Sequence, residues 1–171
     1  MNLIAILFGL IHLSFAFLVV FLILSFFTGA PFVPTPRDHT KEAIDILKVK
    51  PKDIFIDLGS GDGRLLIFAA KRGAYVIGWE INPFLVLYSR WRLLVAGLSK
   101  QSNVYWGDYR KASLRKATCI FIYALPKFMV ALEEKTRNEL QSNCRIVVYK
   151  FAFPHWKKSK QTQSGLYYYT N

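Results

Sequence analysis

The chain has 171 residues, enough for one domain of ordinary size, and a formal net charge of +12. Hydrophobic residues make up 53% of it, yet no Lys, Arg, Asp or Glu occurs before Arg37, so residues 37–171 carry all of the charge. A domain this basic favours anionic partners such as a membrane surface, nucleic acid or an acidic protein face. Cys119 and Cys144 lack metal-site spacing, so the sequence offers neither a zinc site nor a disulfide framework.

The first predicted element is a long apolar helix. Leu3 to Phe27 is about 25 residues without a charged group, long enough to cross a hydrocarbon core of about 30 Å. A secretory signal needs a positive amino-terminal region and a shorter apolar core. We therefore predict an uncleaved, single-pass membrane anchor within residues 1–28. Basic residues follow the span and none precedes it, which predicts a domain on the cytoplasmic or mitochondrial matrix side.

A proline-rich segment, residues 29–37, joins this anchor to the domain predicted for residues 38–171. Its sequence is Gly29-Ala30-Pro31-Phe32-Val33-Pro34-Thr35-Pro36-Arg37. Three prolines within six residues exclude a regular helix and favour a stiff, extended path. Phe32 and Val33 argue against a freely solvated linker, and the segment can lie over a ligand cleft.

Helical and strand patterns alternate through the rest of the chain, which predicts a doubly wound α/β domain. The predicted helices cover residues 38–48 and 65–71, a stripe of Leu87, Trp91, Leu94, Val95 and Leu98 after Asn82-Pro83, and residues 128–140. The predicted strands cover residues 54–56, 75–79, 103–106, 119–123 and 145–150. A last strand at residues 166–169 is expected to be antiparallel at one end of the sheet.

A glycine turn links the first strand to the next helix. It reads Asp57-Leu58-Gly59-Ser60-Gly61-Asp62-Gly63-Arg64. Glycines there permit a tight turn and a close approach of a ligand to the backbone. The spacing is G-x-G-x-G rather than the G-x-G-x-x-G of dinucleotide sites. It resembles the first motif of class I S-adenosylmethionine (SAM) methyltransferases.

Acidic residues stand at successive predicted strand ends. Glu80 ends the second strand about 20 positions after the glycines, where an acid suits a pair of ribose hydroxyls. Asp108 follows the third strand and Gly107, and in the methyltransferase pattern this acid faces the adenine amino group. With Asp57 and Asp62, these are four of only eleven acidic residues, a placement hard to explain as solvated surface.

The chain resembles the membrane-anchored lysine methyltransferases, the family of the enzymes that modify the c-ring protein of ATP synthase and the adenine nucleotide translocase. The resemblance rests on the proline-rich segment after an apolar helix, the glycine turn, and Glu80-Ile81-Asn82-Pro83. It extends to Lys150-Phe151-Ala152-Phe153-Pro154, where Lys150 replaces the family's usual arginine.

This resemblance implies a seven-stranded, Rossmann-like fold, SAM as the methyl donor, no metal, and a lysine on a membrane protein as acceptor. The residues it implies for cofactor binding are Asp57, Gly59, Ser60, Gly61, Asp62, Gly63, Glu80, Asn82 and Asp108. Those it implies for activity are Pro31, Phe32, Pro34 and Thr35.

Two other functions remain open from the sequence. The acceptor could be RNA or a small molecule, because the surface is basic. However, Ala124-Leu125-Pro126 lacks the Asp/Asn-Pro-Pro-aromatic pattern of base-amino methyltransferases, which makes nucleic acid the less favoured partner. The chain could also be a non-catalytic scaffold held on anionic lipid, an interpretation that the four site acids oppose.

Overall fold

The computed structural model describes residues 2–27 and 32–171, with side chains for 2–21 and 32–171. The chain divides into two compact units, residues 1–32 and 33–171. The first unit is α1 (Leu3–Phe27), with the bounds that the apolar run predicts. Its segment Leu3–Phe21 is long and apolar enough to cross a membrane. Membrane insertion and orientation stay predictions.

The second unit is built on one seven-stranded sheet in the order β3-β2-β1-β4-β5-β7-β6. Strands β1 to β5 are parallel, whereas β7 pairs antiparallel with both β5 and β6. The strands are β1 (Ile54–Leu58), β2 (Tyr75–Glu80), β3 (Ser102–Trp106), β4 (Cys119–Ile122), β5 (Arg145–Tyr149), β6 (Lys160–Gln161) and β7 (Leu166–Thr170). The helices are α2 (Arg37–Ile46), α3 (Arg64–Ala70), α4 (Pro83–Val95) and α5 (Met129–Glu139), with short 3₁₀ turns η1 (Ser99–Gln101), η2 (Tyr109–Lys111) and η3 (Pro126–Phe128).

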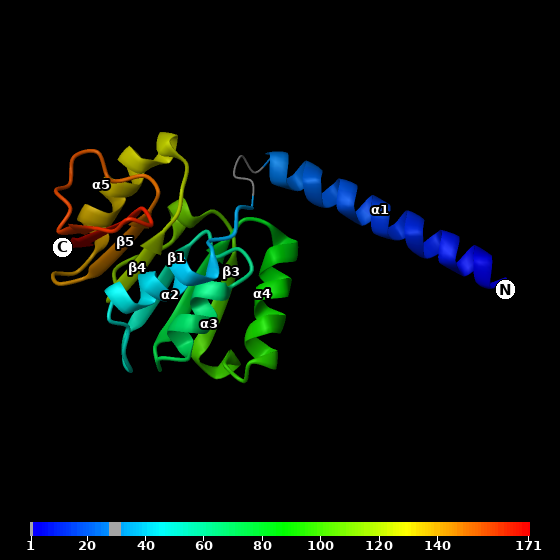
Figure 1. Cartoon of the computed structure of the whole chain (residues 1–171), viewed down its shortest axis with the longest axis horizontal. Helices are drawn as coiled ribbons and strands as arrows, with labels where there is room; N and C mark the ends of the chain where they lie inside the picture. The colour runs from blue at the N-terminus through cyan, green and yellow to red at the C-terminus, as the bar shows by residue number, and fades with distance from the viewer. Residues whose placement is uncertain (1, 28–31) are drawn as a thin grey trace. The chain divides into compact units, whose positions relative to one another are not determined.

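Helices cover both faces of this sheet. Figure 1 shows α2, α3 and α4 on one face and α5 on the other. The first core cluster joins the three helices to side chains such as Phe55, Val76 and Phe121, and the second joins α5 to Ile56, Ile120 and others. Central strands buried on both faces explain why β1 and β4 read as continuous apolar runs. The predicted doubly wound α/β fold is confirmed.

Two details differ from the sequence expectation. The short edge strand β6 lies in what the sequence indicates as a basic loop, so β7 is second from the edge. The helix after Asn82 is present, but its predicted stripe points outward, because the buried residues of α4 are instead Leu85, Val86, Ser89 and Leu93. An apolar sequence on both faces of a helix leaves its buried face undecided.

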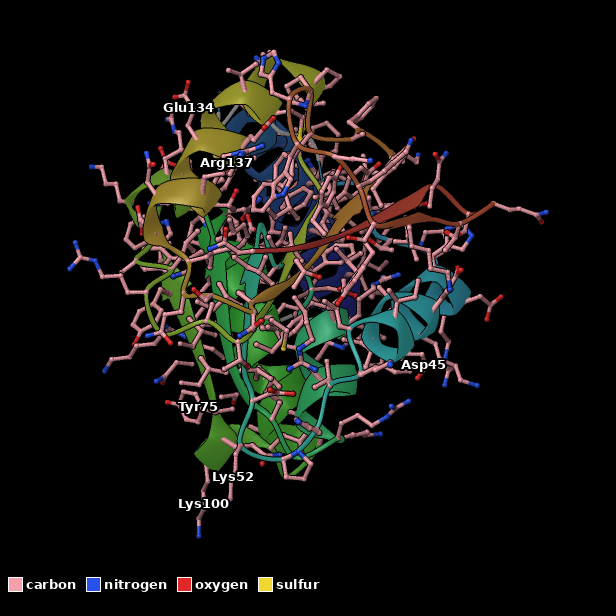
Figure 2. All side chains as sticks on the ribbon, turned by 90° about the vertical axis from the view of Figure 1, so that its left-hand side faces the viewer. Asp45, Lys52, Tyr75, Lys100, Glu134 and Arg137 are labelled. Carbon is pink, nitrogen blue, oxygen red and sulfur yellow. The ribbon has the colours of Figure 1, made fainter. Side chains whose placement is uncertain are left out.

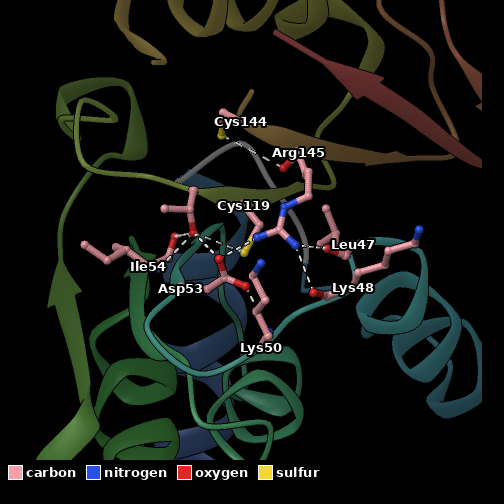
Figure 3. A network of polar contacts seen from close by, with 9 residues as sticks. Leu47, Lys48, Lys50, Asp53, Ile54, Cys119, Cys144 and Arg145 are labelled. Carbon is pink, nitrogen blue, oxygen red and sulfur yellow. Dashed lines mark hydrogen bonds and ion pairs between the residues drawn. The ribbon is translucent and has the colours of Figure 1, made fainter. Parts of the chain in front are cut away.

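The strands begin at one edge of the sheet, where Figure 2 shows Lys52, Tyr75 and Lys100 gathered. At this edge an ion pair ties three strands to α2 (Figure 3). Arg145 pairs with Asp53 and donates to the carbonyls of Leu47 and Lys48, at 2.6 and 2.8 Å. Thr118 Oγ1 donates to the same Asp53 carboxylate at 2.9 Å. Burial alone would raise the pKa of Asp53, but these hydrogen bonds outweigh it and hold the pKa below its usual range.

Replacing Arg145→Met should lower the free energy of unfolding by about 3 kcal/mol, because it leaves the buried Asp53 charge unpaired. A depressed native pKa contributes stability that is complete above about pH 4 and is lost as the pH falls through the native pKa. The variant should therefore lose less stability than wild type between about pH 4 and 2. Urea unfolding followed by tryptophan fluorescence measures both effects, and an unchanged pH dependence would contradict the assignment.

Candidate functional site

The carboxyl ends of β1, β2 and β4 meet at the point where the strand order reverses. From β1 the chain proceeds outward to β2 and β3, then returns to place β4 on the other side of β1. Leu58 at the end of β1 is in register with Trp79 on one side and Ile122 on the other. In open α/β sheets, ligands bind in the crevice at such a switch point.

The glycine turn lies at this point and needs its glycines for different reasons. Gly59, Gly61 and Gly63 all have left-handed φ values, of 94°, 53° and 74°. Gly63 also faces α4 so closely that an added Cβ would lie 2.8 Å from the Cβ of Ser89. The turn is held to β2 because the N–H groups of Gly59 and Ser60 both donate to the Trp79 carbonyl at 2.9 Å.

Glu80 at the end of β2 binds the turn from the other side. Its Oε2 accepts from the N–H of Gly61 at 2.9 Å, and its Oε1 accepts from the N–H of Asn82 at 2.8 Å. Asn82 in turn caps α4, with its side-chain oxygen accepting from the Phe84 N–H at 3.0 Å. Burial raises the pKa of Glu80, and the backbone hydrogen bonds oppose that shift. One carboxylate thus fixes both the middle of the turn and the start of α4.

Two buried polar atoms of the turn have no hydrogen-bond partner within the described part of the chain: Asp57 Oδ2 and Ser60 Oγ. Burial, with the nearby charges of Glu80 and Asp62, raises the pKa of Asp57 well above its usual range. Ser60 fits only because β2 has a glycine opposite, since a Cβ on Gly78 would lie 2.6 Å from Ser60 Oγ. Unsatisfied buried polar groups are rare in folded proteins, and here both face the same turn.

A cluster of ion pairs connects the turn to the proline-rich segment. Asp62 pairs with Arg64 at 2.9 Å and with Arg92 of α4. Arg64 also donates from Nη1 to the carbonyl of Thr35 at 2.7 Å, and Arg92 donates to the Asp62 carbonyl at 2.8 Å. Burial would raise the pKa of Asp62, but Arg64 and Arg92 hold it below its usual range. We call Asp62, Arg64 and Arg92 the arginine clamp.

The structure brings only part of the predicted activity motif to the turn. Thr35 is buried and bound by the arginine clamp, whereas Phe32 and Pro34 are exposed. Pro31 lies outside the described residues.

Asp108 joins the site through the backbone rather than through its own side chain. The N–H of Gly107 donates to the Glu80 carbonyl at 2.9 Å, which places the end of β3 beside the end of β2. The Asp108 carboxylate caps η2 and pairs with Arg110, whose hydrogen bond lowers the pKa of this acid.

An aromatic cluster, not expected from the sequence, lies on the β4 side of the turn. Tyr123 and Tyr149 follow the paired residues Ile122 and Val148, and their ring centroids are 4.8 Å apart. His39 Nδ1 of α2 is 2.8 Å from the Tyr149 hydroxyl. The Lys150 ammonium lies 5.7 Å from the centroids of both tyrosine rings.

No short-range pattern identifies this cluster, since His39 and Tyr149 are 110 positions apart. The same holds for Arg92, which reaches Asp62 from 30 positions away. Arg64 had a local signal, because it follows the last glycine directly.

The strand order, the antiparallel β7 between β5 and β6, and the glycine turn with an acid at the end of β2 define the class I methyltransferase fold. The profile of the ANTKMT methyltransferase domain family matches residues 57–160, and the chain belongs to this family.

Relatives of the chain agree with this assignment. The lysine N-methyltransferase of Homo sapiens that is named for the c-subunit of ATP synthase is 35% identical over 136 residues, covering 80% of this chain but only 58% of that protein. A protein-lysine N-methyltransferase of Saccharolobus islandicus is 29% identical over 135 residues, covering 78% and 84% of the two chains. The predicted family resemblance is confirmed.

One solved structure shares most of the fold. The crystal structure of an RNA methyltransferase from Salinibacter ruber, in complex with S-adenosyl-L-homocysteine, superimposes with a TM-score of 0.78 at 30% identity. The match covers 81% of this chain and 93% of that one.

Gly63→Ala should destabilise the domain more than Gly97→Ala. Both glycines have left-handed φ values, of 74° and 72°, but a Cβ at Gly97 would have no neighbour within 4 Å. The backbone conformation alone should therefore reduce the free energy of unfolding by about 1–2 kcal/mol at Gly97. The contact with Ser89 should add about 1–3 kcal/mol at Gly63. Equal losses in urea unfolding would show that the turn and α4 can move apart freely.

Proposed function

We propose that the chain is a SAM-dependent methyltransferase whose acceptor is a lysine side chain of a membrane protein. The observation that carries the proposal is the buried carboxylate of Glu80, which binds the glycine turn beside two unsatisfied polar atoms at the switch point. The relatives named as protein-lysine methyltransferases support the reaction class.

The residues of the turn fit SAM in charge and in hydrogen-bonding capacity. SAM supplies a methyl group activated on a positively charged sulfur. Asp57, Asp62 and Glu80 surround the turn with carboxylates, a favourable environment for a cationic ligand. Glu80 keeps lone pairs for ribose hydroxyls after its two backbone bonds, and Asp57 Oδ2 and Ser60 Oγ offer further contacts. We also assign cofactor contacts to Gly59, Gly61, Gly63, Asn82 and Asp108.

The aromatic cluster is the proposed place for the acceptor amine. In the register of the sheet, Tyr123 is the residue opposite Gly59 on the neighbouring strand, so the cluster borders the turn. Tyrosine faces attract an ammonium group, and the ammonium of Lys150 already lies near both rings. The acceptor must lose its proton before its nitrogen lone pair can attack the methyl group. The protein's remaining tasks are alignment of the two reactants and exclusion of water.

A membrane acceptor is supported by the helix that precedes the domain. Only six residues separate Phe27 from Val33, so the chain between them spans at most about 20 Å. If α1 is inserted in the bilayer, the site stays near the headgroups and shares the plane of its substrate, which raises the effective concentration. The arginine clamp would then hold Thr35 over the turn, where the stiff segment can shield the reacting amine.

A second candidate acceptor is RNA. The Salinibacter ruber structure that shares this fold is named an RNA methyltransferase, and a charge of +12 suits a phosphate backbone. The test must therefore offer both acceptors.

The experiment incubates full-length protein in nanodiscs with methyl-labelled SAM, membrane fractions and total RNA, and locates the label by gel and mass spectrometry. We expect label on a lysine of a membrane protein. Glu80→Ala should abolish it and weaken S-adenosylhomocysteine binding in calorimetry by at least about tenfold, because two backbone donors lose a charged acceptor. Label solely in RNA would select the second candidate, and no S-adenosylhomocysteine binding by wild type would refute both.

Arg64→Lys should separate cofactor binding from methyl transfer. Lysine keeps the charge beside Asp62 but cannot bridge Asp62 and the Thr35 carbonyl with one planar group. Methyl transfer should fall by about tenfold, while S-adenosylhomocysteine affinity changes by less than about threefold.

Arg72→Lys is the matched control, because Arg72 pairs with Asp45 on the exposed end of α3. Equal rates for the two variants would mean that Thr35 needs no support from the clamp.

A further inference from the structure

Helix α4 is apolar on both of its faces, and only one of them is used by the fold. Leu85, Val86 and Leu93 pack into the core against β2 and β3. The other face carries large apolar side chains that are about half exposed or more: Leu87 63%, Tyr88 48%, Trp91 56%, Leu94 62% and Val95 69%. We call these five residues the outer face of α4.

The outer face is continuous. At 100° per residue, its five side chains fall within an arc of about 120° around the helix. The rings of Tyr88 and Trp91 stack with centroids 5.8 Å apart, so the two largest side chains form one surface. Single exposed apolar residues are ordinary, whereas a gathered stripe on one helix marks a contact with another apolar phase.

The charges around this face are all positive. Residues 81–107, which contain α4 and β3, include no Asp or Glu but have Arg90, Arg92 and Lys100. Arg90 and Arg92 border the stripe on opposite sides, held by the Val104 carbonyl and by Asp62 respectively. Two copies meeting through this face would bring these cations together without compensating acids, which argues against self-association.

Tyrosine, tryptophan and leucine between basic residues are the composition of a helix that lies in a membrane interface. Tyr88 and Trp91 have an apolar body and a polar tip, which suits the headgroup level. Basic residues beside them complement anionic lipids.

We propose that the outer face of α4 lies in the headgroup region of an anionic bilayer and forms a membrane contact separate from α1. Because α4 begins next to Asn82, two residues after Glu80, this contact places the crevice of the glycine turn beside the bilayer surface. The inference does not depend on methyl transfer, since it concerns lipid contact alone.

Site-directed spin labelling of the full-length protein tests the contact directly. A nitroxide is attached at Leu94→Cys, or at Glu134→Cys as the control; the native Cys119 and Cys144 are buried. Glu134 is on α5, on the opposite face of the sheet, and projects from the surface in Figure 2. Each sample holds one chain per nanodisc of phosphatidylcholine and phosphatidylglycerol.

We expect the Leu94 label to collide with dissolved oxygen at least about threefold more than with a water-soluble nickel chelate, relative to the Glu134 label. Equal accessibility of the two labels would overturn the proposal. So would a Leu94 label shielded from both reagents, with spin–spin coupling when discs hold two chains, because that result indicates a second copy as the occupant.

A second variant checks that the outer face itself makes the contact. Leu87→Gln combined with Trp91→Gln should return the Leu94 label to the accessibility of the Glu134 label. Because both side chains are exposed, the unfolding transition should stay unchanged. Retention of the lipid signal in this variant would assign it to α1 alone and refute the role of α4.

Discussion

The site depends on one buried carboxylate. Glu80 accepts hydrogen bonds from the N–H groups of Gly61 and Asn82, so the turn after β1 and the start of α4 are fixed to the same two oxygens. Burial opposes ionisation here and the backbone donors favour it, which makes the geometry of those donors decisive for the charge of the site. The positions of Ser60, Gly63 and α4 all follow from this connection.

The arginine clamp extends this arrangement from the turn to the start of the domain. Arg64 binds the Thr35 carbonyl and the Asp62 carboxylate with one guanidinium, and Arg92 adds α4 to the same acid. A planar group with several donors can join three segments in this way, which a lysine cannot do. The proline-rich segment is thereby connected to the turn at Thr35, while Phe32 and Pro34 remain exposed.

The two faces of α4 give one helix two functions in this view. Its inner face completes the core beside β2 and β3, and its first residues are capped next to Glu80. Its outer face, with Trp91 and Leu94, is the surface that we assign to lipid. The same helix would then set both the depth of the domain on a bilayer and the position of the glycine turn.

The sequence alone determined the features that depend on neighbouring residues. The spacing of Gly59, Gly61 and Gly63 between a buried strand and a helix predicts the turn, and Glu80 follows because parallel strands end at one edge. Only the tertiary structure decided which contacts form between distant segments, such as Arg92 with Asp62 or His39 with Tyr149. It also decided which face of α4 is buried. Periodicity identifies apolar positions on a helix, but the sheet can cover only one side, so Leu93 is inside and Leu94 is outside.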